Sequence, residues 1–555
     1  MTKTKRKIAR KYALVEAAPP RFQYWPWVAQ AAVMILTAAV RIRLLNIPLE
    51  RDEGEFAYMG QLMLQGIPPY KLAFNMKLPG IYAAYSLIMA VFGQSAAGIH
   101  LGILLVNLAA ILMVFLLGKR LFDAYTGLAA AAAYAVMTVV PSFLGFAGHA
   151  THFVILLALC GILVMFRAIE SHKLAYYFLS GVLVGLSFVV KQQGAFLGIF
   201  VGLFIIWSGL RARPVEPRRF VLRFVLFIFG SALPFGLTCL WLKVAGVFSQ
   251  FWFWTFQYAR QYATEVSLSQ GYDSFKTMVP MSISVSGWIW ALGGIGLSML
   301  IWDKSLRERA VFLAGFLLFS FLAVCPGMYF RGHYWILMLP AVSLLAGLAV
   351  SRGGRLLNPL IGSPWNWIVP VVILLIVLSM PLSDSAEFLF LASPTQAAVM
   401  RYGANPFPQA VEIARYIKSH SSPSDRVAVI GSEPEIYFYS ERKSATGYIY
   451  MYELTEKQIF AQKMQAEMFE QVEATKPKYV VFVNVPESLA SGSGDSGPVI
   501  DWFKNYALRN LKVVGIADML SSDSTDYIWG DKAAIYLPRS HTNIAVLEQQ
   551  NLTGR

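Results

Sequence analysis

Long apolar segments dominate this chain and constrain its fold more than any other feature. A helix needs about 20 mostly apolar residues to cross a bilayer. About eleven segments approach that length and are expected to span. They cover residues 26–45, 96–117, 124–142, 150–166, 174–190, 193–209, 220–243, 278–301, 310–325, 333–350 and 366–382. Only 14% of residues are charged and the mean hydropathy is +0.52, which excludes an ordinary water-soluble chain. We therefore expect a polytopic α-helical membrane protein.

Basic residues between these segments predict the orientation. Cytoplasmic loops of membrane proteins carry an excess of Lys and Arg. If the N-terminus is cytoplasmic, the basic tail at 1–20 faces anionic lipid, and the basic clusters near 119–120, 167–173, 211–219, 304–309 and 352–355 are all cytoplasmic. The apolar run 80–92 is too short to cross, and counting it would invert this pattern, so we expect an interfacial or re-entrant helix there. Short basic clusters of this kind do not indicate a nucleic-acid partner.

The composition changes after Pro381. Apolar runs at 426–431, 478–483, 511–516 and 533–537 predict strands, and residues 453–474 predict a helix. Alternating strands and helices indicate a soluble α/β domain at 383–555. With eleven crossings, that domain lies outside the cytoplasm. Residues 21–382 then form the membrane domain, which includes a large external loop at 46–95.

An acidic cluster opens this external loop. Arg51 to Glu55 reads RDEGE and follows the first apolar segment almost at once. Carboxylates beside a bilayer are costly and therefore indicate a functional site. On a helix, Asp52 and Glu55 share a face, Tyr58 lies one turn beyond Glu55, and Glu53 points elsewhere. The alternative is a helix N-terminus at which Asp52 is the cap and the glutamates favour the helix dipole.

Further polar side chains fall in the connections on the same predicted side of the membrane. They are Tyr70, Asn75, Lys77 and Tyr82 in and after the first loop, then His149 and His152, Lys191 and Gln192, and Arg331, His333 and Tyr334. A carboxylate can deprotonate an acceptor, while cations stabilise a departing phosphate. This set therefore indicates glycosyl transfer from a phosphate-linked donor. We expect desolvation to raise the pKa of Asp52, the candidate base, toward the working pH.

Each of these assignments has an alternative. Lys77 and Lys191 lie where lysines commonly extend their ammonium groups to the membrane surface. Arg331 is equally suited to a lipid headgroup. His149 and His152 are three residues apart, a spacing that permits a divalent cation, although a packed or hydrogen-bonded pair is the commoner arrangement. The metal requirement therefore stays open, and no other cofactor is indicated.

The first external loop resembles that of bacterial glycosyltransferases of family 39, which are relatives of protein O-mannosyltransferases and of the aminoarabinose transferase that modifies lipid A. The resemblance rests on the run RDEGEFAYMGQLMLQGIPPYKLAFNMKLPGIYAAYSLIMAVFG. Within it, Asp52-Glu53, Tyr58, residues 66–70 and residues 75–82 fit the family pattern. The later segments GLSFVVKQQGAFLG and YFRGHYWILMLPAVSLLAG are also similar to stretches of the family.

The resemblance implies a GT-C fold in a bacterial-type inner membrane. It implies transfer of a hexosyl or pentosyl group, with inversion, from a polyprenyl-phosphate donor to a lipid, glycan or protein acceptor outside the cytoplasm. Asp52 matches the catalytic acid, with Glu53 and Glu55 in support. Lys77, Lys191 and Arg331 match donor-phosphate contacts.

The chain departs from the family pattern at one place. Many relatives carry an acidic residue before the fourth span, where this chain has His149-Ala150-Thr151-His152. Either a histidine takes over part of that role, or the acceptor chemistry differs. A third alternative is that the chain is a non-catalytic relative that binds polyprenyl lipid. A transporter or flippase is the other alternative, but the charges gather on one face and the sequence shows no inverted repeat.

Overall fold

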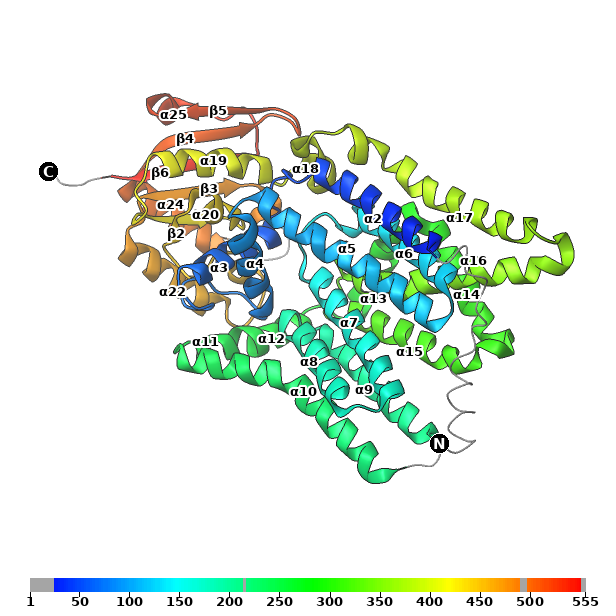
Figure 1. Ribbon diagram of the computed structural model, residues 1–555. Coiled ribbons are helices and arrows are strands. Elements are labelled where there is room, and N and C mark those ends of the chain that lie inside the picture. Colours follow the sequence, from blue (N-terminus) through cyan, green and yellow to red (C-terminus); the bar gives the residue numbers. More distant parts are fainter. Residues whose placement is uncertain (1–23, 213–215, 490–496, 551–555) are drawn as a thin grey trace.

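The computed structural model describes residues 24–212, 216–489 and 497–550. The predicted basic tail at 1–20 lies outside the described residues. A bundle of long helices forms most of the structure, and a six-stranded sheet lies at one end of it (Figure 1). The predicted fold class, a polytopic helical protein with a C-terminal α/β domain, is confirmed.

The predicted spanning segments fall mainly in helices, but segment 278–301 is divided between two helices by the 3₁₀ turn Ser284–Ser286. These helices are α2 (Trp25–Arg43), α5 (Ala96–Leu121), α6 (Ala124–Val139), α7 (Ala150–Ser171), α8 (Leu174–Val190), α9 (Gly194–Arg211), α10 (Pro217–Val244), α13 (Leu268–Ile283), α14 (Gly287–Trp302), α15 (Arg307–Val324), α16 (Leu339–Ile361) and α17 (Trp365–Asp384). Within the described ranges, seven segments are long and apolar enough to cross a membrane. They are α2, α5, α7, α9, α10, the stretch Leu268–Trp302 and α17. The count of eleven crossings stays a prediction.

The structure corrects two of the predicted span boundaries. The eighth segment begins at Leu268, ten residues before the predicted start, because polar residues continue the helix beyond the apolar run. The tenth segment was expected from residue 333, but α16 begins at Leu339. Residues Gly332–Leu337 form a 3₁₀ turn instead, so His333 and Tyr334 lie before the helix and not within it.

Small residues allow the apolar helices to approach closely. In α8, a Cβ added to Gly181 would lie 2.2 Å from the backbone oxygen of Phe227 in α10. In α16, a Cβ at Gly347 would lie 2.6 Å from the backbone oxygen of Thr126 in α6. Glycine at such contacts is typical of helix packing inside membranes, where close backbone approach replaces hydrophobic burial as the source of stability.

The first external loop forms two short helices, α3 (Arg51–Leu64) and α4 (Gly80–Phe92). Glu50 caps α3: its carboxylate accepts a hydrogen bond from the Glu53 backbone N–H, while the Glu53 side chain accepts from the Glu50 N–H. The alternative in which Asp52 caps the helix is therefore wrong, because this reciprocal capping box starts the helix before Asp52. As expected, α4 is apolar and too short to cross a bilayer.

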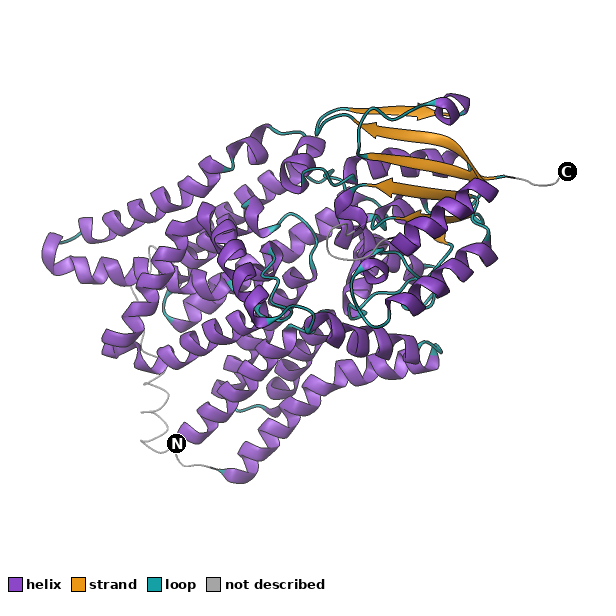
Figure 2. Ribbon diagram, turned by 180° about the vertical axis from the view of Figure 1, so that it is seen from behind, coloured by secondary structure: helices purple, strands orange, loops and turns teal. Residues whose placement is uncertain are grey.

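The C-terminal domain contains a mixed sheet with strand order β2-β1-β3-β6-β4-β5 (Figure 2). The strands are β1 (Arg426–Ile430), β2 (Lys443–Ser444), β3 (Tyr479–Asn484), β4 (Leu511–Met519), β5 (Thr525–Trp529) and β6 (Asn543–Gln549). β1 pairs in parallel with β2 and β3, and the remaining pairs are antiparallel. Three predicted strands are confirmed as β1, β3 and β4.

Two predictions in this domain are wrong. The fourth predicted strand, 533–537, overlaps the short helix α25 (Asp531–Ile535), and its residues Ile535 and Leu537 are exposed rather than buried in a sheet. The predicted helix 453–474 is split into α21 (Tyr452–Thr455) and α22 (Ala461–Thr475).

The remaining described helices complete both parts. On the membrane side these are α11 (Phe248–Trp252), the π-helical turn Phe253–Tyr258 and α12 (Ala259–Ala263). Around the sheet these are α18 (Pro394–Tyr402), α19 (Phe407–Ser419), α20 (Glu435–Ser440), α23 (Pro486–Leu489) and α24 (Gly497–Asn510).

The C-terminal domain docks directly on the first external loop. A Cβ added to Gly54 of α3 would lie 2.6 Å from the Glu435 backbone nitrogen of α20. The Phe74 N–H donates to the Gly447 carbonyl at 2.7 Å, which adds a short parallel bridge. The two halves of the chain are therefore packed backbone to backbone at the loop that carries the acidic cluster.

Candidate active site

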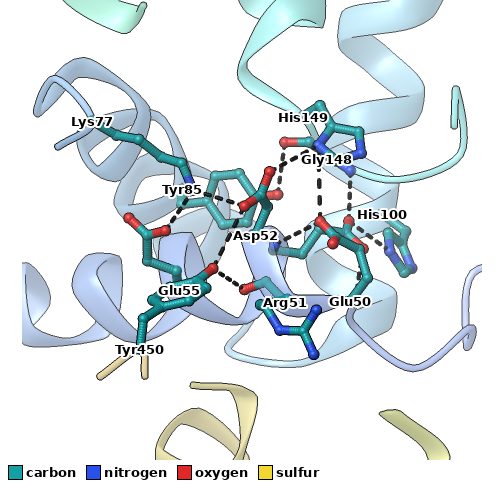
Figure 3. Close-up of polar contacts among 11 residues, drawn as sticks. Glu50, Arg51, Asp52, Glu55, Lys77, Tyr85, His100, Gly148, His149 and Tyr450 are labelled. Carbon is teal, nitrogen blue, oxygen red and sulfur yellow. Dashed lines mark hydrogen bonds and ion pairs between the residues drawn. The ribbon is translucent and has the colours of Figure 1, made fainter. Parts of the chain in front are cut away.

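Lys77 connects the two carboxylates that share a face of α3. Its Nζ donates to Asp52 Oδ1 at 2.7 Å and to Glu55 Oε2 at 2.6 Å (Figure 3). The Tyr82 hydroxyl donates to Glu55 Oε1 at 2.7 Å. The predicted common face of Asp52 and Glu55 is thus present, and Glu55 is fully engaged by Lys77 and Tyr82.

The loop between α3 and α4 is shaped to hold Lys77 in this place. The Tyr70 hydroxyl donates to the Lys77 carbonyl at 2.6 Å, and Tyr70 itself has a φ of 67°. Gln192 Nε2 donates to the Met76 carbonyl at 3.1 Å. The predicted residues Tyr70 and Gln192 therefore hydrogen-bond to the backbone at and next to Lys77. Asn75 is buried, and its Nδ2 lies 3.5 Å from Glu453 Oε1 of the C-terminal domain.

Glu53 points away from this pair, as predicted. Its Oε1 accepts from the Gly148 N–H at 2.6 Å and lies 3.0 Å from His100 Nε2. These contacts fix the connection between α6 and α7 against the start of α3. Sequence reasoning missed His100 because it lies inside an apolar segment that otherwise reads as a plain span.

His149 faces Asp52 on the side opposite Lys77 (Figure 3). His149 Nδ1 lies 3.5 Å from Asp52 Oδ2, and the His149 ring stacks on His333 with centroids 4.0 Å apart. Asp52, His149 and His333 each offer a ligand atom, all within 4.8 Å of one another. Imidazole and carboxylate together suit Zn²⁺ or Mn²⁺, so this triad can hold a divalent cation.

His152 is not part of this triad. It is buried in the first turn of α7, and the partner that His149 finds is His333, which is distant in sequence. The three-residue spacing of His149 and His152 therefore does not predict which imidazole rings lie in contact. The 3₁₀ turn before α16 brings His333 to the site.

Two predicted cations lie nearby without a carboxylate partner. Lys191 follows α8, and its Nζ lies 4.5 Å from the ring centroid of Tyr334. The Arg331 guanidinium lies 5.1 Å from the ring centroid of Tyr329. In the part of the chain that the structure describes, neither Lys191 nor Arg331 forms an ion pair. Both are therefore available to an anionic ligand.

Electrostatics distinguish these groups from one another. Burial alone would raise the pKa of Asp52, but the Lys77 ammonium and the nearby His149 ring hold it well below its usual range. The expectation of a raised pKa at Asp52 is therefore wrong, because nearby positive partners outweigh desolvation. Burial lowers the pKa of Lys191 to about 7, and the charges of Lys77 and Arg331 act in the same direction while Asp52 opposes them.

Glu50 is a second carboxylate that sequence reasoning missed. Burial, followed by the charge of Asp52, raises its pKa to about 7. Its Oε1 lies 3.8 Å from His149 Nδ1. Glu50 directly precedes the RDEGE run, so its place in the sequence was a signal, but its capping role only follows from where α3 begins.

The C-terminal domain contributes to the site as well. The Tyr450 hydroxyl donates to the Arg51 carbonyl at 2.9 Å and lies 3.5 Å from Asp52 Oδ1. Arg51 pairs with Glu433 at 3.1 Å, in the turn after β1. Tyr58, expected to bind substrate, packs on Tyr437 with ring centroids 5.1 Å apart, and its hydroxyl accepts from the Ser444 N–H at 2.8 Å. The structure therefore places Tyr58 in the contact between domains.

Comparison with known proteins agrees with this fold. Residues 77–236 match the family described as dolichyl-phosphate-mannose-protein mannosyltransferase. The matched stretch begins at Lys77 and includes the His149 and Lys191 connections. No curated protein sequence matches the chain.

Solved structures show the same fold at low sequence identity. ArnT from Cupriavidus metallidurans bound to undecaprenyl phosphate aligns with a TM-score of 0.56 and 15% identity, over 94% of this chain and 98% of that chain. The oligosaccharyltransferase AglB from Archaeoglobus fulgidus, in complex with an inhibitory peptide and a dolichol-phosphate, aligns with a TM-score of 0.54 and 13% identity. That alignment covers 92% of this chain and 74% of AglB. The chain therefore has the GT-C fold of membrane glycosyltransferases and resembles family 39, as its first external loop predicts.

Proposed function

We propose that this protein is a membrane glycosyltransferase that moves a sugar from a polyprenyl-phosphate donor to a lipid, glycan or protein acceptor. The observation that carries the proposal is the arrangement around Asp52. An ionised carboxylate lies among Lys77, Lys191 and Arg331, and the latter two lack carboxylate partners within the described part of the chain. A carboxylate base beside uncommitted cations suits a reaction in which a hydroxyl or amine attacks and a phosphate departs.

The proposed reaction is a single displacement at the anomeric carbon. The acceptor oxygen or nitrogen forms the new bond to that carbon, while the bond from the same carbon to the phosphate oxygen breaks. The acceptor proton passes to Asp52, and the electron pair leaves with polyprenyl phosphate. Attack opposite the leaving group inverts the anomeric centre.

Lys77 has a different role from the donor-phosphate contact that the family resemblance implies. Its ammonium already donates to Asp52 and Glu55, which keeps Asp52 ionised and fixes its orientation. Lys191 and Arg331 are then the groups that meet the departing phosphate. Uptake of a proton by Lys191 would accompany donor binding, because the negative charge of the donor phosphodiester favours the charged ammonium.

A divalent cation fits the same site. Asp52, His149 and His333 would hold it, and it would orient the acceptor or neutralise developing charge as a Lewis acid. His149 then stands where relatives carry an acidic residue. We further propose that the site faces the extracytoplasmic side of a bacterial-type inner membrane, with the N-terminus in the cytoplasm.

The test is whether purified full-length protein releases polyprenyl phosphate from a synthetic polyprenyl-phosphate sugar when an acceptor extract is added. A transporter or a non-catalytic lipid-binding protein would leave the donor intact. Release that depends on both acceptor and Asp52 supports the proposal, whereas an intact donor under all acceptor conditions contradicts it.

A further inference from the structure

One segment of the C-terminal domain, residues 447–451, reaches the acidic cluster. Its first residue, Gly447, accepts the Phe74 N–H at its carbonyl, and a Cβ at Gly447 would overlap the Phe74 ring. Its last residue, Met451, is fully buried, and the Met451 N–H donates to the Ser432 hydroxyl at 3.0 Å. The segment is therefore held at both ends, once by the first external loop and once by its own domain.

Tyr450 of this segment contacts the peptide that carries Asp52 (Figure 3). Its hydroxyl donates to the Arg51 carbonyl at 2.9 Å, and that carbonyl carbon is bonded directly to the Asp52 nitrogen. The same hydroxyl lies 3.5 Å from Asp52 Oδ1, which is the oxygen that accepts from Lys77. A single phenol therefore lies against both the backbone and the side chain of the candidate base.

The Tyr450 ring also faces Lys77. The Lys77 Nζ lies 5.6 Å from the Tyr450 ring centroid and 4.8 Å from that of Phe56 in α3. An ammonium within about 6 Å of an aromatic centroid is attracted to the face of the ring. Two carboxylates, Asp52 and Glu55, and two rings thus surround the Lys77 ammonium, and of these four groups Tyr450 alone comes from the C-terminal domain.

Burial separates the role of Tyr450 from that of a group that touches substrate. Tyr450 is 5% exposed, whereas the side chains of Asp52 and Lys77 are 23% and 21% exposed. Tyr450 therefore acts through its neighbours. Such an effect matters for catalysis, because a general base must lie within hydrogen-bond reach of the acceptor proton, and a displacement of about 1 Å can lower the rate about a hundredfold.

We propose that Tyr450 is a positioning residue: its hydroxyl fixes the peptide that carries Asp52, and its ring holds Lys77 against the two carboxylates. The active site is then composite, and the membrane domain has its working geometry only when the C-terminal domain is in contact with it. The inference rests on the proposed function for the role of Asp52 as base, but the placement of Lys77 by Tyr450 is independent of catalysis.

Steady-state kinetics of the full-length protein test this role. The variants are Tyr450→Phe, Tyr450→Leu and the matched control Tyr448→Phe, in which the lost hydroxyl contacts Glu467 of α22 and not the acidic cluster. We expect Tyr450→Phe to lower kcat about three- to tenfold, the scale of one hydrogen bond. Tyr450→Leu loses the ring as well and should lower kcat further. The donor KM should stay unchanged in both, because Lys191 and Arg331 are intact, and Tyr448→Phe should keep wild-type kinetics.

Two further measurements separate positioning from a general structural effect. In an Asp52→Asn background, Tyr450→Phe should cause no additional loss of residual turnover, because a residue that acts through Asp52 has no effect once that base is absent. Reductive methylation of lysines, followed by peptide mass spectrometry, reports the cover over Lys77, with the exposed Lys71 as internal reference. Lys77 should be methylated faster in Tyr450→Leu than in wild type, and at the wild-type rate in Tyr450→Phe. If Tyr450→Leu is poorly folded, Tyr450→Met replaces it.

Wild-type kcat in Tyr450→Phe, an equal loss with and without Asp52, or unchanged methylation of Lys77 in Tyr450→Leu would each overturn the inference. Failure of the proposed function gives a different pattern. In that case wild type releases no polyprenyl phosphate from any sugar donor, while methylation of Lys77 still responds to Tyr450→Leu, which supports the placement of Lys77 by Tyr450.

Discussion

Replacement of Lys77 is the sharpest single perturbation of the proposed site. Its Nζ makes two charge-assisted hydrogen bonds, to Asp52 and Glu55, and both side chains are largely shielded from water. A hydrogen bond to a charged group contributes about 1.5–3 kcal/mol. If one such contribution is lost from the transition state, turnover falls roughly 10- to 150-fold, at 1.36 kcal/mol per tenfold.

We therefore expect Lys77→Ala to lower the rate of donor turnover by that factor, because Lys77 acts through Asp52 and not on the donor phosphate. A second effect follows from the sign of the pKa shift. Lys77 holds the pKa of Asp52 well below its usual range, so its removal raises that pKa. Because the base must be ionised, the acidic limb of the pH–rate profile should move to higher pH in Lys77→Ala.

The assay is release of polyprenyl phosphate from a synthetic sugar donor, measured from pH 4 to pH 9. Lys71→Ala is the matched control, since Lys71 is an exposed lysine of the same loop. Thermal unfolding of each variant checks that it folds. If Lys77→Ala is unstable, the double variant Lys77→Ala/Glu55→Gln replaces it, because Glu55→Gln removes the second buried carboxylate charge. Normal kinetics and an unmoved acidic limb would refute the reasoning and leave Lys77 with a structural role only, as a partner of Asp52 and Glu55.

Three further predictions follow from other parts of the molecule. First, donor affinity should fall as the pH rises above about 7, because Lys191 has a pKa of about 7 and must be protonated to pair with phosphate. Lys191→Arg should remove this pH dependence. An unchanged pH dependence in Lys191→Arg would exclude Lys191 as its source. Second, Gly54→Ala should lower the free energy of unfolding by about 1–3 kcal/mol, because its Cβ would press on the Glu435 backbone. The control Gly294→Ala should leave the free energy of unfolding unchanged, because Gly294 faces open space. Equal unfolding temperatures of the two variants would argue against the contact between Gly54 and Glu435. Third, a reporter that is active only outside the cytoplasm should be active at the C-terminus and inactive at Arg213, and the reverse pattern would contradict the proposed orientation.

Local sequence patterns were enough to predict most of the fold. Apolar length and charge place the helices, and a three-residue spacing puts Asp52 and Glu55 on one face of α3, where Lys77 meets both. The same reasoning failed at residues 533–537, where a short run containing Ala, Ile and Leu looks like a strand. The run lies at the surface, and it pairs with no strand among the residues that the structure describes.

Parts of the site that depend on distant contacts could not be predicted. His333 reaches His149 only because a 3₁₀ turn precedes α16, and no spacing in the sequence encodes that meeting. The pKa of Asp52 is lowered by partners 25 and 97 residues away, so a local argument from desolvation gave the wrong sign.

The central claim is that Asp52 accepts the acceptor proton during transfer of a sugar from a polyprenyl-phosphate donor. The most direct measurement compares release of polyprenyl phosphate by wild type and Asp52→Asn, which keeps the shape of the side chain but removes its basicity. Loss of a general base typically costs a factor of about 10²–10⁴, so we expect turnover to fall at least a hundredfold in Asp52→Asn and by less in Glu53→Gln and Glu55→Gln. Near-normal release by Asp52→Asn with the true donor and acceptor would contradict the account and transfer the role of base to Glu50 or His149.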